Sequence, residues 1–303
     1  MEISDKKSIF ATEDAILLAG MCYQSYLLYE TGKLVRPKGF EITHTIRAVA
    51  GVTQPAEEVF GFIAESENKL VVAFRGTASA ADAESGQDFF QVFFPYIEDG
   101  GKTHRGSTAI YQSARNRLIR ELATFSMQKK LYITGHSLGA SLATLCAIDL
   151  AVNTKFKNPI VYTYGSGRVG DPAFAARFNK AVKHSFRIFN VHDPVPTYPN
   201  CEYPPPFTKK GLAYRHVGQE YPLFFQLNNM AYNHSLSCYF KNISELNPAF
   251  TKRLSEAKPG FCPDTSNCCL TPGPGAQRKL HDNQAKQEPI PLDIFGRTGK
   301  QET

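Results

Sequence analysis

The chain has 303 residues, of which 42% are hydrophobic and 20% charged, a composition typical of globular proteins and not of disordered ones. Its net charge of +6 is spread along the chain without a long basic run, so it gives no argument for nucleic acid as a partner. No apolar run approaches the roughly eighteen residues that a membrane-spanning helix needs, and we therefore expect no transmembrane segment.

The first expected element is a helix over residues 12–30. Thr12 is its predicted N-cap, and Asp14 lies in its first turn. The spacing of the apolar positions predicts an amphipathic helix whose core face carries Ile16, Leu17 and Met21.

The same stretch argues against a signal peptide, since its apolar part, 15–21, is short and directly follows Glu13 and Asp14. Seven cysteines is an odd number, and they lack the paired C-x-x-C spacing of a zinc site. We therefore expect free thiols, no metal and a cytoplasmic protein, with a secreted form cut from a longer precursor as the alternative.

Strands are expected next. Residues 43–49 alternate between apolar and polar, and residues 58–64 and 69–74 form a hairpin around a polar turn. The second hairpin strand runs into Phe74-Arg75-Gly76-Thr77.

Residues 78–87 are small and polar, whereas 88–96 are mostly aromatic without a clear period. Two interpretations stay open for the aromatic stretch. It is either a buried strand or a substrate-facing segment, a mobile lid or the wall of an apolar cleft. In the second case the residues concerned are Phe89, Phe90, Val92, Phe93 and Phe94.

Helical and strand patterns alternate over the middle of the chain. Helices are expected at 107–127 and 172–182, and strands at 159–164 and 186–191. This alternation predicts an α/β fold with a mainly parallel central sheet flanked by helices.

The sequence Gly135-His136-Ser137-Leu138-Gly139 follows a short apolar strand pattern and opens a helix over 138–152. Strand, sharp turn and helix are the context in which G-x-S-x-G forms a nucleophile elbow. Ser137 is therefore the predicted nucleophile. The His136 side chain should point away from it, as a packed, hydrogen-bonded histidine.

A nucleophilic serine needs a base and an acid, which follow it in α/β-hydrolases in the order acid, then histidine. Asp149 lies inside the elbow helix and is excluded by geometry. Asp171 precedes Pro172 and is better explained as a helix N-cap. Asp193, just past the strand at 186–191, is the predicted acid.

The residues alone leave the base open between His216 and His234, the histidines after Asp193 that precede the tail. The oxyanion hole is clearer. One donor should be the backbone N–H of Leu138, which follows the nucleophile. The other should come from Thr77, after the strand at 69–74.

Residues 201–230 are expected to be loop with short strands, and 233–240 to open a last helix. From residue 257 the chain becomes rich in proline, glycine and polar residues. We therefore expect a catalytic domain over 1–256, and over 257–303 a tail that is poorly ordered or packed as a surface arm.

Seven stretches, in order, resemble the fungal-type (class 3) lipases of the α/β-hydrolase superfamily: VVAFRGT (71–77), THRGSTAIY (103–111), YITGHSLGASLA (132–143), YTYGSGRVGD (162–171), FNVHDPVP (189–196), YRHVGQEY (214–221) and NHSLSCYF (233–240). The resemblance covers roughly residues 10–245.

This resemblance implies a single-domain α/β-hydrolase with Ser137, Asp193 and His234 as the triad and Thr77 with Leu138 as oxyanion donors. It decides between the histidines, because the family's catalytic histidine lies just before the final helix. It also favours a lid over 78–94. The chain departs from some family lids in having no tryptophan.

The expected activity is that of a serine carboxylester hydrolase of lipase type, acting on acylglycerol esters, with no cofactor. Its partner would be a lipid or ester substrate, at a lipid–water interface if the lid moves. The alternatives are a phospholipase A, an esterase for short or aromatic acyl groups, and a catalytically silent interaction module.

Overall fold

A seven-stranded sheet forms the centre of the computed structural model, which describes residues 10–206 and 211–268. The strand order is β1-β2-β3-β6-β7-β8-β11. Within it β1 pairs antiparallel with β2 and β2 with β3, and every later pairing is parallel. The predicted mainly parallel α/β architecture is confirmed. The strands are β1 (Glu41–Ala50), β2 (Ala56–Glu65), β3 (Lys69–Phe74), β6 (Lys130–His136), β7 (Ile160–Tyr164), β8 (His184–Asn190) and β11 (Gln219–Leu223).

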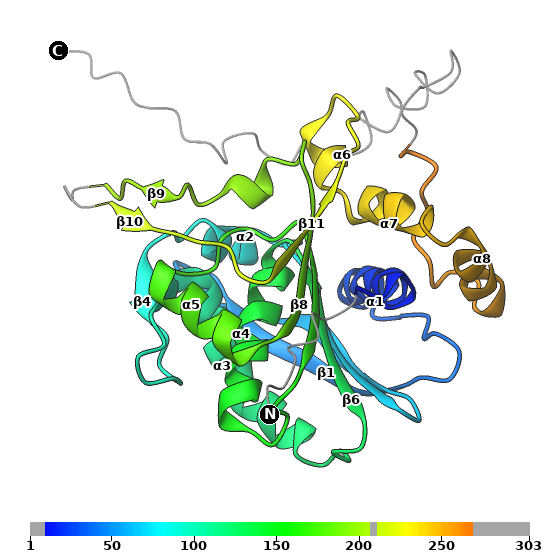
Figure 1. Cartoon of the computed structure of the whole chain (residues 1–303), viewed down its shortest axis with the longest axis horizontal. Helices are drawn as coiled ribbons and strands as arrows, with labels where there is room; N and C mark the ends of the chain where they lie inside the picture. Colours follow the sequence, from blue (N-terminus) through cyan, green and yellow to red (C-terminus); the bar gives the residue numbers. More distant parts are fainter. Residues whose placement is uncertain (1–9, 207–210, 269–303) are drawn as a thin grey trace, which may run out of the picture.

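Helices cover both faces of this sheet (Figure 1). One face carries α1 (Thr12–Thr31), α7 (Leu236–Ser244) and α8 (Pro248–Ala257). The other carries α3 (Arg105–Leu122), α4 (Leu138–Asn153) and α5 (Pro172–Ala181). Successive residues of β3 alternate between the two cores: Leu70 and Val72 pack with α4, whereas Val71 and Ala73 pack with α1. Because both faces are covered, β3 is an unbroken apolar run after Lys69, from Leu70 to Phe74.

Smaller elements extend from the loops at the sheet's edges. They are the helices α2 (Ala80–Gly86) and α6 (Met230–His234), the single 3-10 turn η1 (Val195–Thr197), the paired strands β4 (Gln91–Phe93) and β5 (Lys102–His104), and the paired strands β9 (Glu202–Tyr203) and β10 (Leu212–Ala213). The aromatic stretch contains a short strand, β4, but it is not the buried strand of the first interpretation, since its residue Phe93 is exposed. Strands β9, β10 and β11 are the short strands expected over 201–230.

The first helix differs from the prediction in two ways. Ala11, not Thr12, occupies the N-cap position, and no side chain caps the helix. Nor is α1 amphipathic, because nearly every side chain from Ala15 to Ser25 is buried between the sheet, α7 and the segment after α8. A helix enclosed on several sides is apolar all round, which a one-faced pattern does not describe.

One helix end and one whole helix also differ from the prediction. The long helix α3 ends at Leu122 and not at Met127. Just after this end, Thr124 Oγ1 donates to the carbonyl of Glu121 over 2.7 Å and so competes with the helical hydrogen bonds. Helix α8 was not predicted. Its signal was present, since Asn247 caps it by accepting from the N–H of Phe250, and Pro248 occupies the first turn.

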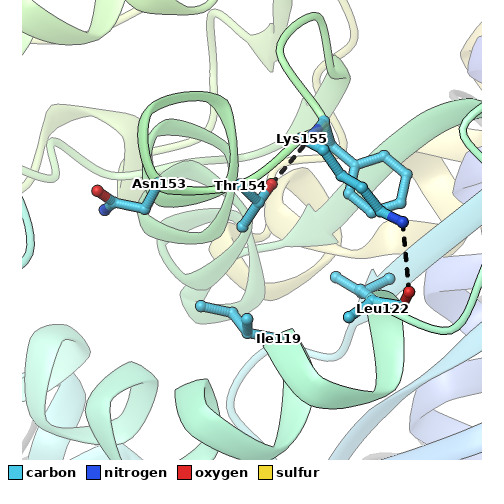
Figure 2. Close-up of a pocket in the computed structure, with 7 residues that line it drawn as sticks. Ile119, Leu122, Asn153, Thr154 and Lys155 are labelled. Carbon is cyan, nitrogen blue, oxygen red and sulfur yellow. Dashed lines mark hydrogen bonds between the residues drawn. The ribbon is translucent and has the colours of Figure 1, made fainter.

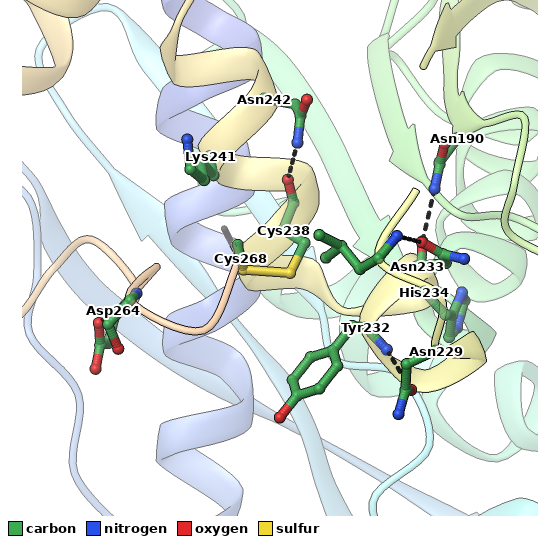
Figure 3. Close-up of a disulfide and its surroundings, with 12 residues drawn as sticks. Asn190, Asn229, Tyr232, Asn233, His234, Cys238, Lys241, Asn242, Asp264 and Cys268 are labelled. Carbon is green, nitrogen blue, oxygen red and sulfur yellow. Dashed lines mark hydrogen bonds between the residues drawn. A yellow bond between two sulfur atoms is a disulfide. The ribbon is translucent and has the colours of Figure 1, made fainter. Parts of the chain in front are cut away.

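The segment after α8 is tied to α1 and α7. Phe261 is fully buried against Gly20, and Gln24 donates to the carbonyls of Gly260 and Phe261 over 2.8 Å. Cys268 forms a disulfide with Cys238 of α7 (Figure 3). The prediction of free thiols is therefore wrong for this pair.

Free thiols are found at Cys22, Cys146, Cys201 and Cys262 within the described ranges. The boundary set at residue 257 stays a prediction, because residues 269–303 lie outside the described part of the chain. Among residues 10–206 and 211–268, no helix is both long enough and apolar enough to cross a bilayer.

Candidate active site

Ser137 stands in a sharp turn between β6 and α4. Its backbone has φ 56° and ψ −123°, and its N–H donates to the carbonyl of Tyr164 over 3.0 Å. The flanking glycines are required by close packing, since a Cβ on Gly135 would lie 2.1 Å from the Gly139 carbonyl oxygen. A Cβ on Gly139 would lie 2.4 Å from the carbonyl oxygen of Arg75. This is the strained strand–turn–helix geometry of a nucleophile elbow.

A line of hydrogen bonds runs from Ser137 to Asp193 through His234. His234 Nε2 lies 2.8 Å from Ser137 Oγ, and His234 Nδ1 lies 2.7 Å from Asp193 Oδ2. The three residues come from the ends of β6, β8 and α6. The structure thus brings together the three residues predicted from the sequence and the family resemblance.

Asp193 is buried, and its carboxylate is fully paired. Tyr239 of α7 donates its hydroxyl to Oδ2 over 2.7 Å, and the N–H of Val195 donates to Oδ1 over 2.9 Å. Burial, followed by the charge of Asp193, raises the pKa of Tyr239 well above its ordinary value, so the phenol stays protonated and remains a donor. The sequence reasoning did not identify Tyr239.

Two buried asparagines join the loops that carry the acid and the histidine (Figure 3). Asn190 donates its side-chain amide to the carbonyl of Asn233 over 3.2 Å. Asn233 in turn accepts from the N–H of Leu227 over 2.9 Å. Because the Asn190–Asn233 bond joins segments 43 residues apart, it ties the loop that carries Asp193 to the turn that carries His234.

Gly165 is a second residue that the sequence reasoning passed over. It follows β7 with φ +57°, and a Cβ there would lie 3.0 Å from Cε1 of His234 and 3.2 Å from Oδ2 of Asp193. Only glycine fits this position without strain. The signal was a glycine directly after a buried strand, in Tyr164-Gly165-Ser166-Gly167.

The predicted oxyanion donors lie on either side of the serine. Leu138 is the first residue of α4, where the early N–H groups have no partner inside the helix. Thr77 is exposed and follows Gly76, whose added Cβ would lie 2.8 Å from the Cβ of Ser137. The chain at Thr77 therefore passes directly beside the nucleophile.

Arg75 anchors this passage and is fully buried. Its guanidinium pairs with Asp82 and, over 2.7 Å, with Glu58, and it also donates to the Gly76 carbonyl over 2.8 Å. It stacks against the Tyr29 ring at 4.0 Å. Charged, paired and stacked on all sides, Arg75 holds the strand end before Thr77 in one place.

Helix α2 is clamped at its first turn by the same ion pair. Asp82 is fully buried and accepts from the N–H groups of Ala78 and Ser79 over 3.1 to 3.2 Å. The hydroxyl of Ser79 accepts from the N–H of Asp82 over 3.1 Å, which completes a capping box. These bonds join the start of α2 to the strand that precedes Thr77.

The far end of α2 is held by a separate set of contacts. Glu84 accepts from the N–H groups of Val52 and Thr53, the former over 2.7 Å. Ser85 Oγ accepts from the N–H of Gly51 over 2.9 Å. A Cβ on Gly106 would lie 1.8 Å from the Ser85 carbonyl oxygen, so α3 packs hard against this end.

The five apolar residues proposed as lid or cleft lie in different surroundings. Phe94 is 2% exposed and packs in the core against Tyr96 and Phe174, so its prediction as a cleft residue is wrong. An aromatic stretch without a period could not separate core from surface. Phe93 is 73% exposed. The half-buried members are Phe89, against His104 and Tyr203, Phe90, against Arg105, and Val92.

The competing acids and histidine have other partners. Asp171 caps α5 by accepting from the N–H of Phe174 over 2.7 Å, as predicted. Asp149 pairs with Arg115 and accepts from Tyr111. His216 Nε2 lies 2.8 Å from the carbonyl oxygen of Pro196, and burial, followed by nearby arginines, lowers its pKa to about 3.

The protein also has a surface pocket of about 300 Å³, and Figure 2 shows residues that line it. It is lined from the C-terminal ends of α3 and α4, including Ile119, Leu122 and Phe156, and Lys155 reaches the carbonyl of Ala123 across it. Ser137 caps the opposite end of α4, about 24 Å away at 1.5 Å per residue. The pocket is therefore separate from the serine site.

Fold and site together define a Ser-His-Asp constellation on an α/β-hydrolase scaffold. Residues 71–203 match the family model described as Lipase (class 3), so the expected resemblance to the class 3 lipases is confirmed over this part of the chain.

Three relatives illustrate the match. A lipase from Rhizomucor miehei is 33% identical over 163 residues, which is 52% of this chain and 42% of that protein. Its structure in complex with its propeptide is similar at 25% identity with a TM-score of 0.55, covering 71% of this chain and 69% of that one.

The other two relatives have different substrate names. "Phospholipase A1 EG1, chloroplastic/mitochondrial" of Oryza sativa subsp. indica is 29% identical, covering 66% of this chain and 57% of that protein. "Secreted mono- and diacylglycerol lipase A" of Penicillium camembertii is 32% identical, covering 53% and 50%. The chain thus spans about half the length of the curated relatives it matches.

Proposed function

We propose that this chain is a serine carboxylester hydrolase of lipase type that acts on acylglycerol esters. The observation that carries the proposal is the hydrogen-bonded line from Ser137 Oγ through His234 to Asp193, at 2.8 and 2.7 Å, on a nucleophile elbow. The match of residues 71–203 to the Lipase (class 3) family model and the names of the fungal relatives support the same substrate class.

In the proposed mechanism Ser137 Oγ attacks the ester carbonyl carbon while His234 Nε2 takes the hydroxyl proton. The carbonyl oxygen becomes an oxyanion that accepts hydrogen bonds from the Leu138 N–H and from Thr77. The tetrahedral intermediate then collapses, and the alcohol leaves with the proton from His234. Water then attacks the acyl-enzyme while His234 takes a proton from it. His234 gives this proton to Ser137 Oγ as the carboxylic acid leaves.

Asp193 does not lose or gain a proton in this scheme. It holds the His234 imidazole with Nδ1 protonated and Nε2 facing the serine, and stabilises the imidazolium when it forms. The hydrogen bonds from Tyr239 and Val195 keep the carboxylate in place.

A phospholipase A1 is the alternative that a specific observation favours, because one relative carries that name over the longest of the three alignments, 254 residues. Both activities cleave an acyl ester of glycerol by the same chemistry. An esterase for short or aromatic acyl groups also uses the same residues. A catalytically silent interaction module is disfavoured by the intact hydrogen-bonded line.

For the segment that follows Thr77 we propose a fixed wall in place of a mobile lid. The first turn of its helix α2 is joined to the buried Arg75 by Asp82. The last turn of α2 is held by the 51–53 loop through Glu84 and Ser85. Opening such a segment would leave a buried arginine with half its pairing, which is costly. The oxyanion donor would therefore be in position before substrate arrives.

We also propose an oxidising compartment for this chain. The Cys238–Cys268 disulfide supports this in place of the cytoplasmic location expected from the sequence, and the Penicillium relative is named as secreted. Counting alkylatable thiols in protein from its native source, before and after reduction, tests the point, since Cys238 and Cys268 should become alkylatable only after reduction.

The test of the function is a series of soluble and emulsified substrates: short- and long-chain esters, triacylglycerol and phosphatidylcholine. Ser137→Ala should abolish hydrolysis of whichever of these the wild type cleaves. A fluorophosphonate probe should label the wild type at Ser137. Full ester hydrolysis by the Ser137→Ala variant would refute the proposed nucleophile.

A further inference from the structure

His136, the residue before the nucleophile, is hydrogen-bonded through both ring nitrogens. Its Nδ1 lies 2.8 Å from the hydroxyl of Tyr26, which belongs to α1. Its Nε2 lies 2.9 Å from the backbone carbonyl oxygen of His234. The candidate base is therefore attached to the elbow twice, once through its own ring at Ser137 and once through its carbonyl at His136.

The direction of each bond follows from the partners. A carbonyl oxygen only accepts, so His136 Nε2 must carry a proton and donate it to His234. In the neutral ring Nδ1 is then an acceptor, and Tyr26 must donate to it. His136 is 5% exposed, and burial, with the neighbouring His234 as a second cause, lowers its pKa well below the ordinary value. The ring is therefore neutral and needs a single tautomer.

Tyr26 is held where it can enforce that tautomer. Its hydroxyl lies where Gly76 has no side chain, since a Cβ on Gly76 would come within 2.3 Å of it. Burial raises the pKa of Tyr26 above its ordinary value, so the phenol remains a donor. The hydroxyl thus sits between the strand end that leads to Thr77 and the ring of His136.

We propose that Tyr26 and His136 are positioning residues for the base, forming a relay in which the Tyr26 hydroxyl fixes the His136 tautomer and His136 fixes the backbone of His234. The inference rests on the proposed ester hydrolysis at Ser137. Neither residue touches the reacting atoms. Without the Tyr26 hydroxyl the proton of His136 is free to move to Nδ1, which turns the lone pair of Nε2 toward the His234 carbonyl. The two acceptors then repel, and His234 moves away from Ser137.

The test is a double-mutant cycle with Tyr26→Phe and His136→Gln. Glutamine reaches as far as Nε2 of histidine and can donate its amide to the His234 carbonyl, but it has no tautomer for Tyr26 to fix. Tyr26→Phe alone should lower kcat on a soluble short-chain ester about tenfold with KM unchanged, the effect of one buried acceptor losing its donor. In the His136→Gln background the same substitution should change kcat less than about twofold.

Two further variants sharpen the cycle. In His136→Asn the side chain is too short to reach the His234 carbonyl, so kcat should fall at least as much as in Tyr26→Phe. His136→Gln should retain most of the wild-type kcat. Tyr23→Phe removes a hydroxyl from the same helix, three residues away, and should leave kcat unchanged. Melting temperatures of all variants identify any loss due to unfolding.

A purely structural role for Tyr26 predicts equal losses of kcat in both backgrounds, and that result overturns the proposal. So does an unchanged kcat in Tyr26→Phe. A readout independent of turnover is the ¹⁵N chemical shift of the His136 ring, which should report protonated Nε2 in the wild type and a mixture of tautomers in Tyr26→Phe. Protonation at Nδ1 in the wild type also overturns it.

The cycle separates failure of this inference from failure of the function. If Ser137→Ala abolishes hydrolysis and Tyr26→Phe does not lower it, only the relay is refuted. If Ser137→Ala retains hydrolysis, the proposed function is refuted, and the ring shifts still decide whether the Tyr26–His136 bond fixes a tautomer.

Discussion

Gly165 lies directly against the imidazole of His234, so that a Cβ on the glycine would stand 3.0 Å from Cε1 and 3.1 Å from Nδ1 of the histidine. The first contact is closer than carbon atoms normally approach, and φ at Gly165 is +57°, a region that other residues rarely adopt. The position is thus closed to any side chain on two independent grounds.

We expect Gly165→Ala to lower kcat by about 10²-fold, because a displacement of His234 by a fraction of an ångström to 1 Å breaks its alignment with Ser137. The variant is assayed on a soluble ester and by the rate of fluorophosphonate labelling. Gly211→Ala is the matched control, since its Cβ would meet nothing closer than 3.7 Å. A wild-type kcat in Gly165→Ala would contradict the prediction, because it would show that the added methyl group does not displace His234 from Ser137.

Asp193→Asn should lower kcat by about 10³- to 10⁴-fold, because an amide offers a donor where Tyr239 and His234 both need an acceptor, and the histidine tautomer is lost. Asp171→Asn is the control, as asparagine caps a helix as well as aspartate does and α5 should be unaffected. The measurement is steady-state kinetics on one soluble ester. Similar kcat values for the two variants would remove Asp193 from the proposed triad.

Acid should destabilise the fold through buried neutral histidines. Burial lowers the pKa of His104 to about 4, against 6.5 in the unfolded chain. Because the folded pKa is the lower one, the unfolded chain binds a proton first, and stability present above pH 6.5 is lost as the pH falls toward 4. The expected slope is about 1.4 kcal/mol of unfolding free energy per pH unit for each such histidine. His216, with its pKa lowered to about 3, adds a second.

His104→Asn tests this prediction, since His104 caps α3 by accepting from the N–H of Ser107 and asparagine can take over the cap without titrating. Urea unfolding at several pH values should show a shallower loss of stability below pH 6 in His104→Asn than in the wild type. An unchanged slope in His104→Asn would contradict the prediction.

The Cys238–Cys268 disulfide closes a loop of 30 residues. Removing it with Cys238→Ala and Cys268→Ala should lower the free energy of unfolding by about 3–4 kcal/mol on the chain-entropy model. Cys201→Ala, at an exposed free cysteine, should change stability by less than about 0.5 kcal/mol. The measurement is denaturant unfolding under non-reducing conditions. Equal stabilities would mean that the buried Phe261 already holds the segment.

The fixed wall predicts that the rate per enzyme does not jump when an ester exceeds its solubility. Asp82→Asn should cost about 3 kcal/mol of stability, the low end for breaking a buried ion pair, since Glu58 still faces Arg75. Glu121→Gln removes a surface partner of Arg117 and should cost under about 1 kcal/mol. Rates measured across the solubility limit decide the point, and a jump in the wild type would favour the mobile lid.

The sequence by itself determined the elements whose signals are local. The hairpin, the alternation of helices and strands, the elbow around Ser137 and the cap at Asp171 all depend on residues within a few positions of one another. The order of the acid and the histidine after the serine followed from the fold class. The same reasoning could not separate His216 from His234, and the family resemblance decided between them.

Only the tertiary structure decided which distant side chains meet. Tyr26 reaches His136 across 110 residues, Asn190 bonds to Asn233 across 43, and Cys238 pairs with Cys268. Phe94 entered the core for the same reason. Whether an aromatic or charged side chain is buried depends on what packs over it, and burial in turn sets its pairing, its pKa and its role. These contacts are products of packing and have no periodic signal in the chain.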